Sequence, residues 1–126
     1  MQTERTGHAS VRLTVNGVEA RLLVDTGANV NTLDTTEGRR AKPVVVASSE
    51  SQPGEGRANM TLAYGAIPLG TQQFSVMDLG FINVSSARYG TEPFMGQLGA
   101  SFFTEYKARL DFERMTLCLT VPKGER

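Results

Sequence analysis

Apolar and polar residues alternate along the first part of the chain with the two-residue period of half-buried β-strands. Residues 10–25 read SVRLTVNGVEARLLVD and carry the pair Asn16-Gly17 at their centre. This dipeptide favours a two-residue type I′ turn, so the pattern predicts a β-hairpin. Counting outward from the turn places apolar residues opposite one another on one face: Val15 with Val18, Leu13 with Ala20, and Val11 with Leu22.

Strand-like patterns continue through most of the remaining chain, separated by segments rich in turn-forming residues. Residues 48–57, SSESQPGEGR, carry no large apolar side chain, so they predict a surface loop. Residues 58–86 are rich in strand-forming residues, with turn glycines at Gly65 and Gly70. The other expected segments are strands at 29–34 and 42–49, a basic loop at 36–42 and a connecting loop at 87–96.

The C-terminal third of the chain predicts one short helix and a closing hairpin. Residues 98–106, LGASFFTEY, carry apolar side chains at helical spacing. A hairpin is expected about Glu113-Arg114, and Cys118 falls in its second strand, where a small buried thiol is expected. The apolar side chains of this hairpin are Leu110, Phe112, Leu117 and Leu119. The pattern as a whole predicts an all-β, barrel-like domain.

The size and charge of the chain narrow the class of protein. Its 126 residues suit one domain, which we place at residues 10–121, between a flexible N-terminal segment, 1–9, and a tail, 122–126. Thirteen basic and thirteen acidic side chains balance, which argues against a nucleic-acid partner. No apolar run approaches the roughly 20 residues that cross a bilayer, and the first ten residues lack the apolar core of a secretory signal.

Metal and disulfide chemistry are not expected from this composition. The single cysteine allows no intramolecular disulfide. The single histidine, His8, lies in the polar N-terminal segment, and one histidine with one cysteine does not build a convincing zinc site. We therefore expect neither a metal nor a cofactor.

The most informative residues are Asp25, Thr26 and Gly27, which directly follow the apolar run Leu-Leu-Val. The tripeptide arises by chance in about 2–3% of chains of this length, and its plainest interpretation is a strand end whose carboxylate caps nearby N–H groups. Its context is more specific, because Ala28 and a return strand follow it and GQLGASFF at residues 96–103 opens a short helix. This combination favours a catalytic aspartate over a simple turn.

Residues 10–120 resemble the retropepsin family, the single-domain aspartic proteases of retroviruses, and resemble its cellular and bacterial relatives more closely. NGVEARLLVDTGANVNTLD is similar to the family's catalytic strand and loop, and GQLGASFF to its hydrophobic-hydrophobic-Gly element and helix. YKARLDFERMTLCL is similar to the closing hairpin of the cellular and bacterial branch. The resemblance implies a closed retropepsin-like barrel with one short C-terminal helix. Related bacterial proteins often lie at the cell envelope, which favours a periplasmic or membrane-anchored parent protein.

Aspartic-protease chemistry needs two carboxyls close together. One carboxylate takes a proton from the attacking water, while the second, protonated carboxyl donates to the carbonyl oxygen of the peptide bond. Two carboxylates about 3 Å apart repel by roughly 5 kcal/mol at an effective dielectric of about 20, so the pair retains one proton. The chain has one Asp-Thr-Gly, and Asp34, Asp78 and Asp111 lack the Thr-Gly turn. We therefore predict a symmetric homodimer in which each chain contributes Asp25.

The resemblance also assigns roles to the neighbours of the aspartate. It implies that Thr26 hydrogen-bonds across the two-fold axis and that Gly27 lets the backbone approach the substrate. Ala28 and Asn29 would line the cleft, and the pair Leu98-Gly99 would support the catalytic loop from beneath. A protein or peptide substrate would bind as an extended strand, with alternate side chains in pockets.

Three features depart from the pattern of related sequences. Gln97 stands where an apolar residue is more frequent, and Asn31 stands where Thr or Ser is usual. The family covers its cleft with a flexible hairpin flap, for which the best match is residues 48–57, an unusually polar segment. These departures leave open a catalytically inactive descendant of the fold that serves as a dimerisation or peptide-binding module. The other alternative is a monomeric β-barrel binding protein in which Asp-Thr-Gly is only a turn.

Overall fold

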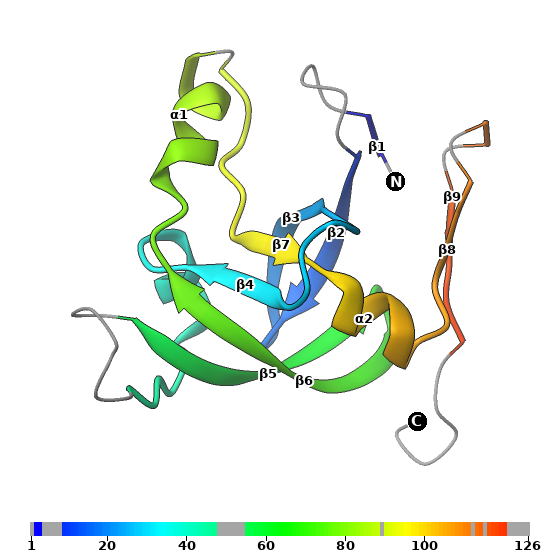
Figure 1. Ribbon diagram of the computed structural model, residues 1–126, viewed down its shortest axis with the longest axis horizontal. Helices are drawn as coiled ribbons and strands as arrows, with labels where there is room; N and C mark the ends of the chain where they lie inside the picture. Colours follow the sequence, from blue (N-terminus) through cyan, green and yellow to red (C-terminus); the bar gives the residue numbers. More distant parts are fainter. Residues whose placement is uncertain are drawn as a thin grey trace.

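The computed structural model describes residues 2–3, 9–47, 55–88, 90–111, 113–114 and 116–120. Strands dominate this part of the chain (Figure 1). The strands are β1 (Gln2–Thr3), β2 (Ala9–Val15), β3 (Val18–Val24), β4 (Asn31–Asp34), β5 (Gly56–Tyr64), β6 (Ile67–Met77), β7 (Gly96–Leu98), β8 (Arg109–Asp111) and β9 (Thr116–Cys118). The helical elements are the 3-10 helix η1 (Glu37–Ala41) and the α-helices α1 (Gly80–Arg88) and α2 (Ala100–Glu105). The predicted all-β class is confirmed.

Six of these strands close into a barrel of mixed direction. They follow the order β2-β3-β7-β4-β6-β5, and β5 returns to β2 through the pairs Thr14–Ala63 and Val15–Leu62. Within the barrel, β3 is parallel to β7 and β4 is parallel to β6. The strand β1 pairs with the first residues of β2. Because β3 and β7 run in the same direction, their carboxyl ends lie side by side at one edge of the barrel.

The N-terminal hairpin has the predicted register, which begins with Val15 opposite Val18 and includes all three expected pairs. Asn16 and Gly17 have φ angles of 50° and 82°, as a type I′ turn requires. The side-chain oxygen of Asn16 also accepts a hydrogen bond of 2.8 Å from the N–H of Thr61. The local turn is thereby tied to β5, next to the point where the barrel closes.

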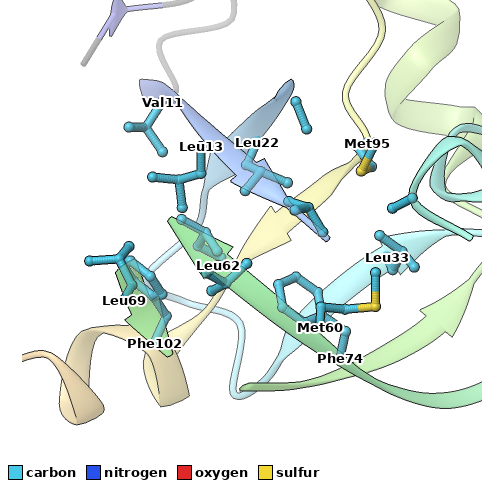
Figure 2. Close-up of a cluster of buried hydrophobic side chains, with 14 of the residues drawn as sticks. Val11, Leu13, Leu22, Leu33, Met60, Leu62, Leu69, Phe74, Met95 and Phe102 are labelled. Atoms are coloured by element: carbon cyan, nitrogen blue, oxygen red, sulfur yellow. The ribbon is translucent and has the colours of Figure 1, made fainter. Parts of the chain in front are cut away.

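The inward-facing side chains of the strands form one apolar core, which Figure 2 shows in close-up. The predicted helix at residues 98–106 is confirmed as α2, whose Phe102 projects into the barrel and is completely buried (Figure 2). The Phe102 ring lies 4.9 Å from the ring of Tyr106, centroid to centroid. The largest fully buried side chains are Tyr106, Phe74, Phe102, Leu13, Leu22, Leu33, Met60, Leu62, Leu69, Met95, Leu98 and Val15.

The predicted C-terminal hairpin is confirmed as a separate two-stranded sheet of β8 and β9, at one side of the barrel in Figure 1. Leu110 pairs with Leu117, and both pack against the core. Cys118 pairs with Arg109 and is exposed, so the prediction of a buried thiol is wrong. Successive residues of a strand point to opposite faces, and the face that carries Cys118 is turned to solvent. Phe112 lies outside the described residues.

The expectation of strand structure up to residue 86 is wrong at its end, where α1 occupies Gly80–Arg88. The carboxylate of Asp78 accepts a 2.7 Å hydrogen bond from the N–H of Gly80 and turns the chain into the helix. The side chain of Asn83 binds both the carbonyl and the N–H of Phe94, at 3.0 and 2.8 Å. These hydrogen bonds stabilise the helix. The sequence of the helix has no apolar periodicity that would predict it.

Residues 36–47 also differ from the expected loop and strand. The expected loop contains η1, and the only regular pairing among residues 42–47 is a single bridge between Val46 and Arg57, with N–H to carbonyl distances of 2.8 and 3.0 Å. Lys42 adopts a left-handed conformation with φ of 49°, and Pro43 has no N–H to donate to a neighbouring strand, so both residues disfavour a strand that starts at residue 42. The Val46–Arg57 bridge closes the base of the flap candidate, whose residues 48–54 lie outside the described residues.

Asp34 is a buried carboxylate, 2% exposed, that ties the end of β4 to two other segments. Its oxygens accept the N–H groups of Leu79 at 2.7 Å and Glu37 at 2.8 Å. We expect Asp34→Asn to lower the free energy of unfolding by about 2 kcal/mol, because the amide keeps one acceptor and turns a donor toward the other N–H. Denaturant unfolding measures this difference. The half-buried Asp111→Asn is the matched control, expected to change stability by less than about 0.5 kcal/mol; equal losses in both variants would contradict the assignment.

Candidate active site

The Asp25 loop connects the buried end of β3 to the start of β4. Asp25 follows the buried residues Leu22, Leu23 and Val24, and its own side chain is half-buried. One carboxylate oxygen accepts a 3.0 Å hydrogen bond from the N–H of Gly27, and the Asp25 carbonyl accepts the N–H of Ala28 at 3.1 Å. The apolar strand brings the carboxylate to the barrel edge, and the turn holds it there.

Residues 98–101 bind this loop along its length. The N–H of Asp25 donates to the carbonyl of Leu98 at 3.0 Å, where β7 runs parallel to β3. The N–H of Ala100 donates to the Ala28 carbonyl at 2.7 Å, and the N–H of Ser101 donates to the next carbonyl along at 3.3 Å. The start of α2 therefore acts as a platform for the loop, and backbone hydrogen bonds hold both ends of the loop against it.

Gly99 lies at the centre of this platform, where the two backbones come closest. A Cβ atom at this position would lie 2.4 Å from the carbonyl oxygen of Val30 and 2.8 Å from that of Ala28. Its φ of −108° is open to any residue, so lack of space alone requires glycine here. The glycine of the Leu98-Gly99 pair is thus explained by the close approach of its backbone to the loop that begins with Asp25.

The structure brings all of the predicted site residues to one edge of the barrel. Thr26, Gly27 and Asn29 are exposed, while Ala28 is half-buried. The exposed residues are available to a substrate or a second copy of the chain, and the roles that the resemblance gives them stay predictions.

Two polar residues behind the loop complete its environment. Asn31, the first residue of β4, is fully buried, and its side-chain oxygen accepts the N–H of Gly99 at 3.0 Å. Its side-chain nitrogen donates to the Gln72 oxygen at 2.6 Å. From the sequence, Asn31 was noted only as a departure from the Thr or Ser of related sequences, and Gln72 was missed. The only signal for Gln72 is its place in the two-residue pattern of inward-facing residues of β6. Gln97 is half-buried in β7, opposite Leu23 and Thr32.

An arginine holds the segment that leads into β7. Arg21 is buried, its guanidinium lies 4.1 Å from the centroid of the Phe94 ring, and it donates to the carbonyl of Glu92. Burial lowers the pKa of Arg21, and the Glu92 carboxylate opposes that shift. The pKa of Arg12 is raised by its hydrogen bond and charge pairing with Glu92, and to a smaller extent by Glu19. These contacts anchor residues 92–94, which lead into β7 and so into the residues that support the Asp25 loop.

The other aspartates of the described chain are engaged elsewhere. Asp34 accepts the two backbone N–H groups described above, Asp78 accepts the N–H of Gly80, and Asp111 accepts that of Arg114. Across the described ranges, no group of three His, Cys, Asp or Glu residues could hold a metal ion. His8 lies outside those ranges. No helix among the described residues is long and apolar enough to span a membrane.

Comparisons with known proteins bear on the fold. No family model matches the chain, and no curated protein matches its sequence. The retroviral protease-like domain of Ddi1 from Leishmania major aligns with a TM-score of 0.66 and 15% identity, over 89% of this chain and 83% of that one. A retropepsin-like aspartic protease from Rickettsia conorii aligns with a TM-score of 0.61 and 18% identity, over 90% and 82%.

A viral enzyme gives the same result. The EIAV protease, solved in complex with the inhibitor HBY-793, aligns with a TM-score of 0.56 and 16% identity, over 89% of this chain and the whole of that one. The chain therefore has a retropepsin-like fold, and the predicted closed barrel is confirmed.

Proposed function

We propose that two copies of this chain form an aspartic endopeptidase in which the two Asp25 carboxyls activate water for attack on a peptide bond. The observation that supports this most directly is the loop itself. A carboxylate stands at the end of a buried strand and is held by Gly27, Leu98 and the platform around Gly99. The retropepsin-like neighbours add support, since two of them are named as proteases.

The need for a second chain follows from the carboxyl count. Water activation requires two carboxyls, one ionised and one protonated. Asp34, Asp78 and Asp111 bind backbone N–H groups away from the loop, so the economical source of the second carboxyl is a second Asp25. A two-fold axis close to the exposed Thr26 would bring the two loops together.

In the proposed reaction, one Asp25 carboxylate takes a proton from water and the other carboxyl donates its proton to the carbonyl oxygen. The leaving nitrogen then takes the proton that the first Asp25 carboxyl holds, and the C–N bond breaks. A hydroxyl of the tetrahedral species gives its proton to the second Asp25 carboxylate as the new carboxyl group of the product forms, so the pair again holds one proton. No covalent enzyme intermediate forms. The substrate is a protein or peptide bound in extended form, and no metal, cofactor or nucleic acid takes part.

Activity should follow the fraction of dimer. We expect a species of twice the 13.6 kDa chain mass in sedimentation, and a specific activity that falls on dilution in proportion to the loss of that species. Cleavage of a diverse peptide library, with and without a hydroxyl-bearing transition-state mimic such as pepstatin, measures the activity. Full activity in a purely monomeric sample would contradict the proposal.

The same measurements of mass and peptide cleavage distinguish the proposed protease from the two alternative functions. A stable dimer that binds peptides but cleaves none of the library would favour a dimerisation or peptide-binding module of the same fold. A chain that stays monomeric at every concentration and has no activity would favour the β-barrel binding protein, in which Asp25 is a turn residue.

A further inference from the structure

Two side-chain amides from distant strands meet behind the Asp25 loop. Asn31 at the start of β4 is fully buried, and Gln72 in β6 is 9% exposed. The Asn31 Nδ2 donates to the Gln72 Oε1 at 2.6 Å, while the Asn31 Oδ1 accepts the N–H of Gly99 at 3.0 Å. The amide of Asn31 therefore bridges β6 and the platform beneath the loop.

The orientation of this bridge is determined by its donors. The backbone N–H of Gly99 can only donate, so the Asn31 oxygen must face it and the Asn31 NH₂ group must face the other way. Gln72 then has to present its oxygen, as it does. An apolar side chain at position 72 would leave the NH₂ group of Asn31 without that acceptor, and a buried unpaired amide favours a different rotamer or solvent entry.

The bridge acts on the backbone that holds the candidate catalytic group. Gly99 follows Leu98, whose carbonyl accepts the N–H of Asp25. Gly99 also precedes Ala100, whose N–H donates to the carbonyl of Ala28. A shift of Gly99 therefore moves both anchors of the loop together. Placement errors of about 1 Å in a catalytic group can reduce turnover about a hundredfold.

We propose that Gln72 is a positioning residue: it holds the Asn31 amide in the orientation that fixes Gly99, and thereby sets the position of the Asp25 carboxylate. This inference rests on the proposed function for its catalytic consequence. The hold on Gly99 is a property of the folded chain alone. Gln72 does not touch the reacting atoms and acts only through Asn31.

The direct test is Gln72→Met, which keeps the approximate length of the side chain and replaces its amide oxygen with a weakly accepting thioether sulfur. We expect kcat to fall about 30-fold with KM changed less than about threefold, because positioning and not substrate binding is lost. Hydrogen exchange of the Gly99 N–H should accelerate at least about tenfold, since its acceptor is no longer held. Gln73→Leu, in the next, exposed position of β6, is the matched control and should change neither quantity.

A second substitution tests the coupling. In Asn31→Thr/Gln72→Met, a hydroxyl oxygen can accept the Gly99 N–H without a partner at position 72, so kcat should return to within about fivefold of the parent. Losses that multiply in the double variant would overturn the proposal, as would parental kcat and Gly99 exchange in Gln72→Met. If the parent protein hydrolyses nothing, the proposed function fails and Gly99 exchange decides alone: faster exchange in Gln72→Met supports the hold on Gly99, and unchanged exchange overturns it.

Discussion

Asp25→Asn should reduce peptide hydrolysis at least about 10³-fold, because the amide can neither accept the proton of water nor share a proton with its counterpart. The fold should survive, since the side-chain oxygen of Asn can still accept the N–H of Gly27. Steady-state cleavage of a fluorogenic peptide gives the loss, and sedimentation together with denaturant unfolding shows that assembly and stability are retained.

The matched control for this variant is Asp78→Asn. This variant makes the same chemical change between β6 and α1, where the Asp78 carboxylate accepts the N–H of Gly80, so hydrolysis should stay within about twofold of the parent. Co-assembled dimers with one parental and one Asp25→Asn chain should also be inactive, because each site needs both carboxyls. Parental activity in the pure Asp25→Asn dimer would refute the mechanism.

Gly99→Ala should have the largest effect on stability of the substitutions considered, lowering the free energy of unfolding by about 3 kcal/mol. The new methyl group would lie 2.4 Å from the Val30 carbonyl oxygen and 2.8 Å from that of Ala28. Both atoms belong to the backbone, so relief requires the loop and α2 to separate. Chemical denaturation measures the loss, and hydrolysis should fall with it even at temperatures where the variant is folded.

Gly65→Ala is the control, because alanine at this position would destabilise the protein through backbone strain and not through lack of space. Gly65 has a φ of 59° and open space around its Cβ position, so alanine there introduces only the strain of a left-handed residue, about 1 kcal/mol. A Gly99→Ala loss no larger than that of Gly65→Ala would show that the loop and α2 separate easily. The platform would then not be rigid.

Local signals were sufficient for the elements whose geometry depends on neighbouring residues. The register around Asn16-Gly17 followed from the turn preference and the two-residue period, and the apolar spacing of residues 98–106 located α2. The same reasoning failed for α1, which is held by Asp78 and Asn83. It also failed for Cys118, because burial in an apolar strand depends on which face another element covers.

The candidate site likewise has features that the sequence predicts and features that only the tertiary structure determines. The order of an apolar strand, Asp-Thr-Gly and a distant Leu98-Gly99 pair identified a strand-end carboxylate and its support from the linear chain, because strand, turn and glycine preferences act over a few residues. The pairing of Asn31 with Gln72 spans 41 residues and that of Gly99 with Asn31 spans 68. Such contacts exist only after barrel closure brings β4, β6 and β7 together, so folding in three dimensions alone selects the partner of each buried polar group.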